Sequence, residues 1–135
     1  MTRSGGCFCG AVRYEVTGAV YNLTTCHCET CRRVAGAPAV SWLTVALGGF
    51  RLVNGTPTKL RSSAHVTRTF CATCGTPLTY QRDDGPDELD VTICSLDQPE
   101  ALPPQDHTQA SERLPWNMVC DGLPQYPRLR TSGTT

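Results

Sequence analysis

The chain has 135 residues, 39% of them apolar and 18% charged, and its twelve basic and twelve acidic side chains cancel at neutral pH. This length predicts a single domain over residues 1–135 with a modest core, and the balanced charge argues against a nucleic-acid partner. No apolar run is long enough to span a membrane, and the polar start, MTRSGGCFCG, lacks the apolar centre of a secretory signal. We therefore expect a cytoplasmic protein.

Most of the chain is predicted to form β-strands with short connections, because apolar and polar residues alternate or β-branched and aromatic residues dominate. Five strands are expected, at residues 11–16, 39–45, 65–71, 76–82 and 88–96. The first should bury Val12, Tyr14 and Val16, which share one face of the strand. The third and fourth flank a Cys-x-x-Cys segment, as the two arms of a hairpin would.

Only one short helix fits the pattern. Residues 29–36 can form a helical turn, which Gly36 and Pro38 end. From Gln98 onward the many prolines predict extended, loop-like structure. The last residues, 128–135, are expected to form a flexible tail.

The nine cysteines are the most informative feature of the sequence. Seven of them fall in three close groups: Cys7 with Cys9, Cys26 with Cys28 and Cys31, and Cys71 with Cys74. Disulfide frameworks scatter cysteines over many loops and need an even number, whereas close groups are typical of metal sites. Zinc–sulfur bonds of about 2.3 Å place neighbouring sulfurs about 3.8 Å apart, which a Cys-x-x-Cys turn can provide. The spacing favours zinc over the two alternatives, a disulfide framework and an iron–sulfur cluster.

Seven ligands divide naturally into four and three. A structural zinc takes four protein ligands, and a catalytic zinc takes three and keeps one position open. The natural three are Cys26, Cys28 and Cys31, and the natural four are Cys7, Cys9, Cys71 and Cys74. Spacing alone leaves another division open, in which Cys28 and Cys31 join Cys71 and Cys74 in a zinc ribbon.

The segments GGCFCGAVRYEV, CHCETCRRVAGAP, FCATCGTPLTY, LDQPEALPPQDH and LPWNMVCDGLPQY follow one another in this order. Together they resemble the glutathione-dependent formaldehyde-activating enzyme family, whose domain is shared with centromere protein V, over about residues 4–127. The resemblance implies a mainly β fold of the β-tent type, which contains a zinc ribbon and short helical turns. It also implies two zinc ions per chain, a structural one on Cys7, Cys9, Cys71 and Cys74 and a catalytic one on Cys26, Cys28 and Cys31.

The activity implied by the resemblance is that of a carbon–sulfur lyase that forms or cleaves S-hydroxymethylglutathione, with glutathione and formaldehyde as partners. Zinc suits this role because it deprotonates a thiol whose free pKa is about 8.5. Arg32 and Arg33 follow the metal loop directly and are candidates for binding a glutathione carboxylate; plain surface charge is the other interpretation. A different thiol or aldehyde, a zinc-stabilised interaction module without catalytic activity, and a homodimer all stay open.

Five further residues receive simpler predictions. His27 is expected to point away from the metal, and His107 to make a structural hydrogen bond rather than to shuttle a proton. Trp116 is expected to pack in the core. Cys94 and Cys120 are expected to be buried free thiols.

Overall fold

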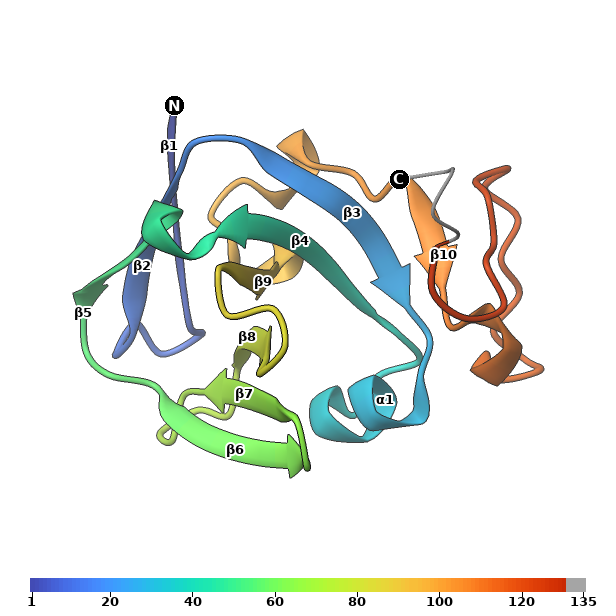
Figure 1. The fold of residues 1–135 in the computed structure, drawn as a ribbon, viewed down its shortest axis with the longest axis horizontal. Coiled ribbons are helices and arrows are strands. Elements are labelled where there is room, and N and C mark those ends of the chain that lie inside the picture. Colours follow the sequence, from blue (N-terminus) through green and yellow to red (C-terminus); the bar gives the residue numbers. More distant parts are fainter. Residues whose placement is uncertain (131–135) are drawn as a thin grey trace.

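Two β-sheets form the described part of the chain, residues 1–130 of a computed structural model (Figure 1). The smaller sheet has the order β1-β2-β5, and the larger has the order β10-β3-β4-β9-β8-β7-β6. Neighbouring strands are antiparallel, except that β10 runs parallel to β3. The strands are β1 (Thr2–Gly6), β2 (Arg13–Thr17), β3 (Val20–Cys26), β4 (Val40–Ala46), β5 (Phe50–Asn54), β6 (Thr58–Ser63), β7 (Val66–Phe70), β8 (Pro77–Arg82), β9 (Glu88–Thr92) and β10 (Asp106–Thr108). The helical elements are α1 (Glu29–Ala35) and the 3₁₀ turns η1 (Leu47–Gly49), η2 (Ile93–Ser95), η3 (Pro99–Ala101) and η4 (Ala110–Glu112).

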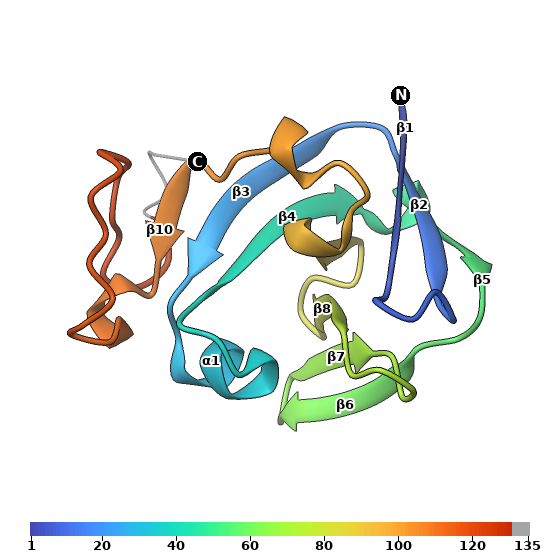
Figure 2. The same cartoon turned by 180° about the vertical axis from the view of Figure 1, so that it is seen from behind.

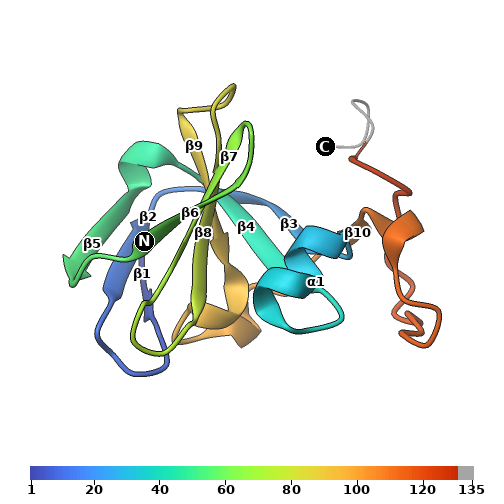
Figure 3. The same ribbon diagram turned by 90° about the horizontal axis from the view of Figure 1, so that it is seen from below.

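The smaller sheet and the C-terminal segment lie at opposite ends of the molecule (Figure 3). Between them, the long curved strands β3 and β4 cross the molecule, and α1 lies beside the ends that it connects (Figure 2). The predicted mainly β fold of the β-tent type is confirmed. Neither α1 nor the short 3₁₀ turns of residues 1–130 could cross a membrane.

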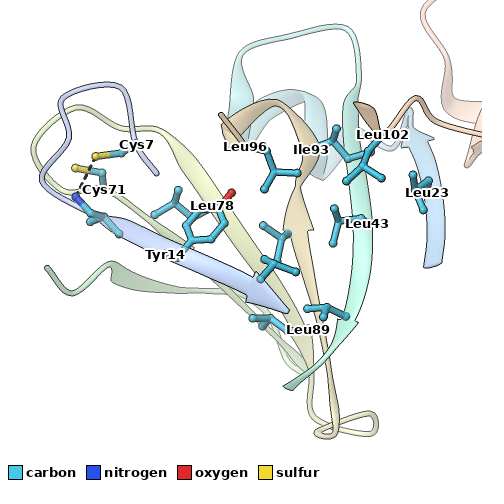
Figure 4. Close-up of a cluster of buried hydrophobic side chains, with 14 residues drawn as sticks. Cys7, Tyr14, Leu23, Leu43, Cys71, Leu78, Leu89, Ile93, Leu96 and Leu102 are labelled. Atoms are coloured by element: carbon cyan, nitrogen blue, oxygen red, sulfur yellow. Dashed lines mark hydrogen bonds between the residues drawn. The ribbon is translucent and has the colours of Figure 1, made fainter. Parts of the chain in front are cut away.

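The core lies between the two sheets and takes side chains from both (Figure 4). As predicted, Val12, Tyr14 and Val16 of β2 are buried, at 3%, 1% and 1% exposure. They belong to one cluster with Leu43 of β4 and Val91 of β9, which are also fully buried. Each such side chain stabilises the fold by about 1.5–3 kcal/mol relative to an exposed position. The alternating pattern of β2 therefore fixes which face of the smaller sheet meets the larger one.

Tyr14 also explains why β1 contains glycine. The hydroxyl of Tyr14 lies within hydrogen-bond distance of Ser95 Oγ, at 2.6 Å. This contact joins β2 of the smaller sheet to η2, the turn that follows β9 of the larger sheet. A Cβ atom at Gly5 would lie 2.5 Å from that hydroxyl, so a larger residue would displace the ring or the strand.

All five strands predicted from the sequence are present, as β2, β4, β7, β8 and β9. The last ends at Thr92 rather than at residue 96, because η2 turns the chain away from the sheet. Strands β1, β3, β5, β6 and β10 were not predicted. The short helix is confirmed: Gly36 ends it with a left-handed backbone conformation at φ 62°, and its N–H bonds to the carbonyl of Arg32.

The proline-rich segment after Gln98 is mostly irregular, as expected, but it contains β10. Asp106 of β10 is buried and forms an ion pair with Arg130, at 2.5 Å between Oδ2 and Nε. The carbonyl of Arg128 accepts a hydrogen bond from the backbone of Gln109. The first residues of the predicted tail are thus bound to the domain, and residues 131–135 lie outside the described part of the chain.

Candidate metal centres

Four cysteines from distant parts of the chain meet where the turn after β1 approaches the turn between β7 and β8. The Sγ atoms of Cys7, Cys9, Cys71 and Cys74 all lie within 4.8 Å of one another. The distances are 3.6 Å from Cys7 to Cys9 and 3.7 Å from Cys9 to Cys71, close to the spacing of about 3.8 Å that a tetrahedral zinc imposes. Figure 4 shows Cys7 and Cys71 together at one end of the core. This four-cysteine site fits a metal ion that joins the two sheets.

The turn between β7 and β8 is built to present sulfur atoms. The backbone N–H of Cys74 donates to Cys71 Sγ at 3.4 Å. Gly75 follows with φ at 86°, a conformation that other residues rarely adopt. The hydroxyl of Thr76 hydrogen-bonds Cys74 Sγ at 3.3 Å, and this bond lowers the pKa of Cys74 to about 5. The turn therefore favours the thiolate of Cys74, which is the form of a cysteine that binds metal.

The second group of cysteines lies in the loop from β3 to α1. Cys26 ends β3, Cys28 caps the N-terminus of α1, and Cys31 lies in the first turn of that helix. Their Sγ atoms also lie within 4.8 Å of one another. Cys31 N–H donates to Cys28 Sγ at 3.3 Å, and hydrogen bonds from the Cys26 and Cys31 thiols lower the pKa of Cys28 to about 2. This three-cysteine site fits a metal ion that keeps room for one more ligand.

The structure therefore groups the cysteines as four and three, the division favoured by coordination chemistry. The zinc ribbon that would combine Cys28 and Cys31 with Cys71 and Cys74 is not the grouping that the described residues form.

Arg68 is a residue of the three-cysteine site that sequence reasoning missed. It lies in β7, is 5% exposed, and places Nη1 and Nη2 each 3.6 Å from Cys31 Sγ. Its strand, VTRTF, alternates so that Arg68 shares one face with the apolar Val66 and Phe70, while Thr67 and Thr69 lie on the other face. That alternation, in a strand that ends directly before Cys71, was the signal that could have indicated an inward-facing arginine near a cysteine site.

A chain of hydrogen bonds holds the three-cysteine loop to β10. His27 lies between two cysteines but is 1% exposed, and its Nε2 lies 2.9 Å from His107 Nδ1. His107 Nε2 in turn lies 2.7 Å from Asp121 Oδ2. Burial is the main reason that the pKa of His27 is lowered, so this ring is neutral near pH 7. The ring of His27 thus bonds to β10, and His107 makes the structural hydrogen bonds expected of it.

A shallow groove of about 360 Å³ lies beside the C-terminal half of α1 and the loop that follows it. Its walls include Arg32, Arg33, Pro38, Leu114 and Trp116. The prediction that Trp116 packs in the core is wrong: the side chain is 69% exposed, because it stands in the irregular segment after η4. Arg33 pairs with Glu29 one helical turn earlier at 2.9 Å. Arg32, by contrast, has a buried Nε atom without a partner among residues 1–130.

The two isolated cysteines are also placed differently from the prediction. Cys94 and Cys120 are free, as expected, but both are exposed rather than buried. Cys94 lies in η2 instead of continuing the alternation of β9, which turns its side chain outward. Cys120 lies in an irregular segment that no strand or helix covers.

The fold and the two cysteine sites define a small, mainly β protein with two places suited to metal ions. Residues 2–112 match the family described as glutathione-dependent formaldehyde-activating enzyme, so the chain belongs to that family, as the sequence motifs predicted. An uncharacterized lyase of Schizosaccharomyces pombe is 31% identical over 81 residues, which are 60% of this chain and 58% of the relative. The chain therefore matches little more than half the length of that relative.

The crystal structure of a Rhodobacter sphaeroides protein is also similar, with a TM-score of 0.60 and 26% sequence identity. The similarity covers 91% of this chain and 98% of that chain. The arrangement of the two sheets is thus shared over nearly the whole of both proteins.

Proposed function

We propose that this protein is a zinc-dependent carbon–sulfur lyase that forms or cleaves S-hydroxymethylglutathione or a closely related thiol–aldehyde adduct. The observation that carries the proposal is the three-cysteine site, which is complete and separate from the four-cysteine site. A domain that needs metal only for stability has its four ligands already in the other site. Family membership and the lyase named among its relatives support the same class of reaction.

The four-cysteine site would hold a structural zinc, and the three-cysteine site would hold a second zinc. That second ion, when bound, would lower the pKa of a thiol ligand and keep it as a thiolate at neutral pH. The reaction joins the glutathione sulfur to the formaldehyde carbon and moves the thiol proton to the carbonyl oxygen, so it needs neither oxidant nor reductant. Because it is freely reversible, one site serves both directions.

The chain's own residues bind and orient the thiol. Arg32 directly follows Cys31 on α1 and offers a guanidinium that has no carboxylate partner among residues 1–130. A glutathione carboxylate could accept paired hydrogen bonds from it, while the exposed ring of Trp116 covers the apolar part of the peptide. Arg33 is less suited, because Glu29 already pairs with it. Fixing the thiol beside its electrophile converts a bimolecular encounter into a step within one complex.

Exchange NMR on an equilibrated mixture of formaldehyde, glutathione and their adduct tests the proposal. The rate is measured with wild type, with Cys28→Ala, with Cys94→Ala and without protein. Cys94 lies outside both metal sites and is exposed, so it is a matched control for the loss of a cysteine. Wild type and Cys94→Ala should accelerate exchange, and Cys28→Ala should not.

Equal rates in all four samples would reject this substrate pair. The same assay with other small thiols and aldehydes then separates the two remaining alternatives. Acceleration of another pair would indicate a lyase with a different substrate, and no acceleration of any pair would favour the interaction module.

A further inference from the structure

Arg68 is a buried cation that lacks the usual kind of partner. Its side chain lies within the larger sheet at 5% exposure. Several other arginines of the described chain pair with carboxylates, as Arg61 does with Asp83 and Arg130 with Asp106. For Arg68, no aspartate or glutamate among residues 1–130 lies within ion-pair distance. A buried charge without a counter-charge is strongly unfavourable, so its surroundings must compensate in another way.

The contacts of Arg68 show where that compensation lies. Nε donates to Ser62 Oγ at 3.2 Å. The guanidinium carbon lies 5.8 Å from the ring centre of Trp42 and 5.0 Å from that of Tyr80, within the range of cation–π attraction. The two remaining nitrogens both point to one atom, Cys31 Sγ, at 3.6 Å each. The aromatic rings hold the guanidinium in place, and among residues 1–130 the sulfur of Cys31 is the potentially anionic atom to which it donates hydrogen bonds.

A metal ion bound at the three-cysteine site would give Arg68 a negatively charged partner. Three thiolates and one divalent cation leave a net charge of −1, and a fourth thiolate makes it −2. Such a site is itself the negative partner that a buried guanidinium needs. The four-cysteine site has no arginine within hydrogen-bond distance of its sulfurs among residues 1–130, so the two sites differ in this respect.

We propose that Arg68 is a positioning residue of the three-cysteine site, which fixes Cys31 by two hydrogen bonds and offsets the negative charge of the metal–thiolate centre. By doing so it raises the affinity of this site for zinc and for one further thiolate. The inference rests on the proposed function, because it requires that Cys26, Cys28 and Cys31 hold a metal ion. Outer partners of metal ligands typically change metal affinity by about 10–100-fold when they are removed.

The test compares full-length wild type with Arg68→Met, Arg68→Lys and Arg82→Met, all loaded with zinc. Methionine keeps the length of the arginine stem but removes the charge and the donors, whereas lysine keeps the charge and loses the two-pronged geometry. Arg82 lies on the neighbouring strand β8 with an exposed partner, Asp84, and serves as the matched control. Competition with a chromophoric chelator measures the affinity of each site, and the more tightly bound zinc of the four-cysteine site reports the folded state of the same sample.

We expect Arg68→Met to weaken zinc binding at the three-cysteine site by about 10–100-fold and Arg68→Lys to weaken it less. The four-cysteine site should be unchanged in both variants, and Arg82→Met should match wild type. A second readout is the sulfur-to-cobalt charge-transfer band after cobalt replaces the weakly held zinc. Loss of two hydrogen bonds to Cys31 should shift that band to lower energy in Arg68→Met, which a purely structural role would not do.

Zinc affinity and band position equal to wild type in both Arg68 variants would overturn this inference and leave the proposed function intact. If Arg68→Met does not fold, the folded Arg68→Lys protein decides by the same two readouts. A wild-type three-cysteine site that takes up neither zinc nor cobalt would overturn both the inference and the proposed function.

Discussion

Replacing Cys74 by alanine should unfold the domain, whereas replacing Cys28 by alanine should not. Cys74 belongs to the four-cysteine site, whose members Cys9 and Cys71 lie 62 positions apart in the chain. This site joins the turn after β1, in the smaller sheet, to the turn between β7 and β8, in the larger sheet. Without it, the non-covalent contacts between the two sheets that remain among residues 1–130 are core packing and polar pairs such as Tyr14 with Ser95 and Arg13 with Asp97.

The magnitudes separate the two variants clearly. Structural zinc contributes about 10–16 kcal/mol of binding free energy in small zinc domains, and the whole stability of a domain is about 5–15 kcal/mol. Cys74→Ala should therefore abolish cooperative folding. Cys28 caps a short helix between β3 and β4, which stay paired along most of their length. Cys28→Ala should cost about 1–3 kcal/mol, or about 5–10 °C in melting temperature.

Thermal melts followed by circular dichroism measure both effects, with Cys94→Ala as the control because its exposed thiol belongs to neither site. We expect a cooperative transition for Cys94→Ala and Cys28→Ala and none for Cys74→Ala. Equal losses for Cys74→Ala and Cys28→Ala would refute the assignment of one structural and one open site.

Three other predictions address the groove, the core and the metals. Arg32→Ala and Trp116→Ala should each raise the KM for the thiol about tenfold, as expected for loss of one charge-assisted or apolar contact. Arg33→Ala should change the KM little. Steady-state kinetics checks this, with thermal melts to show that the variants are as stable as wild type. Burial raises the pKa of Asp90 to about 6, so the folded state holds this proton more tightly than the unfolded chain, and the free energy of unfolding should fall between about pH 4 and pH 6. Asp90→Asn, which can still accept the hydrogen bond from Thr44, should remove that slope and raise stability by about 3 kcal/mol at pH 7 in urea titrations. An unchanged slope would contradict this. Mild chelation should remove one zinc from each chain and leave the melting temperature nearly unchanged. Metal analysis and a thermal melt of the treated protein measure these two effects. Loss of both ions together would argue against two independent sites.

The sequence predicted correctly those features whose evidence lies within one short segment of the chain. Strand β2 alternates regularly, and its inward residues are buried as predicted. The cysteine groups also carry their own spacing, so the sequence together with the coordination number of zinc favoured the division into four and three. Gly36 and Pro38 marked the end of α1 for equally local reasons.

It failed where the structure depends on distant partners. Strand β3 contains Asn22 at φ 51° and a break in register, so its sequence does not alternate. Strand β10 has three buried polar residues, which are satisfied only by long-range partners such as Arg130 and His27. The role of Arg68 was missed for the same reason, because its aromatic neighbours and Cys31 come from other elements.

Local hydrophobicity was also a poor guide to burial in the irregular segments. Trp116 was expected in the core on the grounds of its size, yet no sheet or helix covers the segment that carries it. Trp116 instead lines the groove that also contains Arg32.

Zinc X-ray absorption of the two-zinc protein, with and without glutathione, tests the central claim most directly. Seven cysteine sulfurs shared by two zinc ions give an average of three and a half sulfur neighbours per zinc. If the three-cysteine site accepts a thiol, the average should rise to four when glutathione is added, and Cys28→Ala should abolish the rise. An average that stays unchanged on addition of glutathione to fully loaded wild-type protein would contradict an open, thiol-binding metal site.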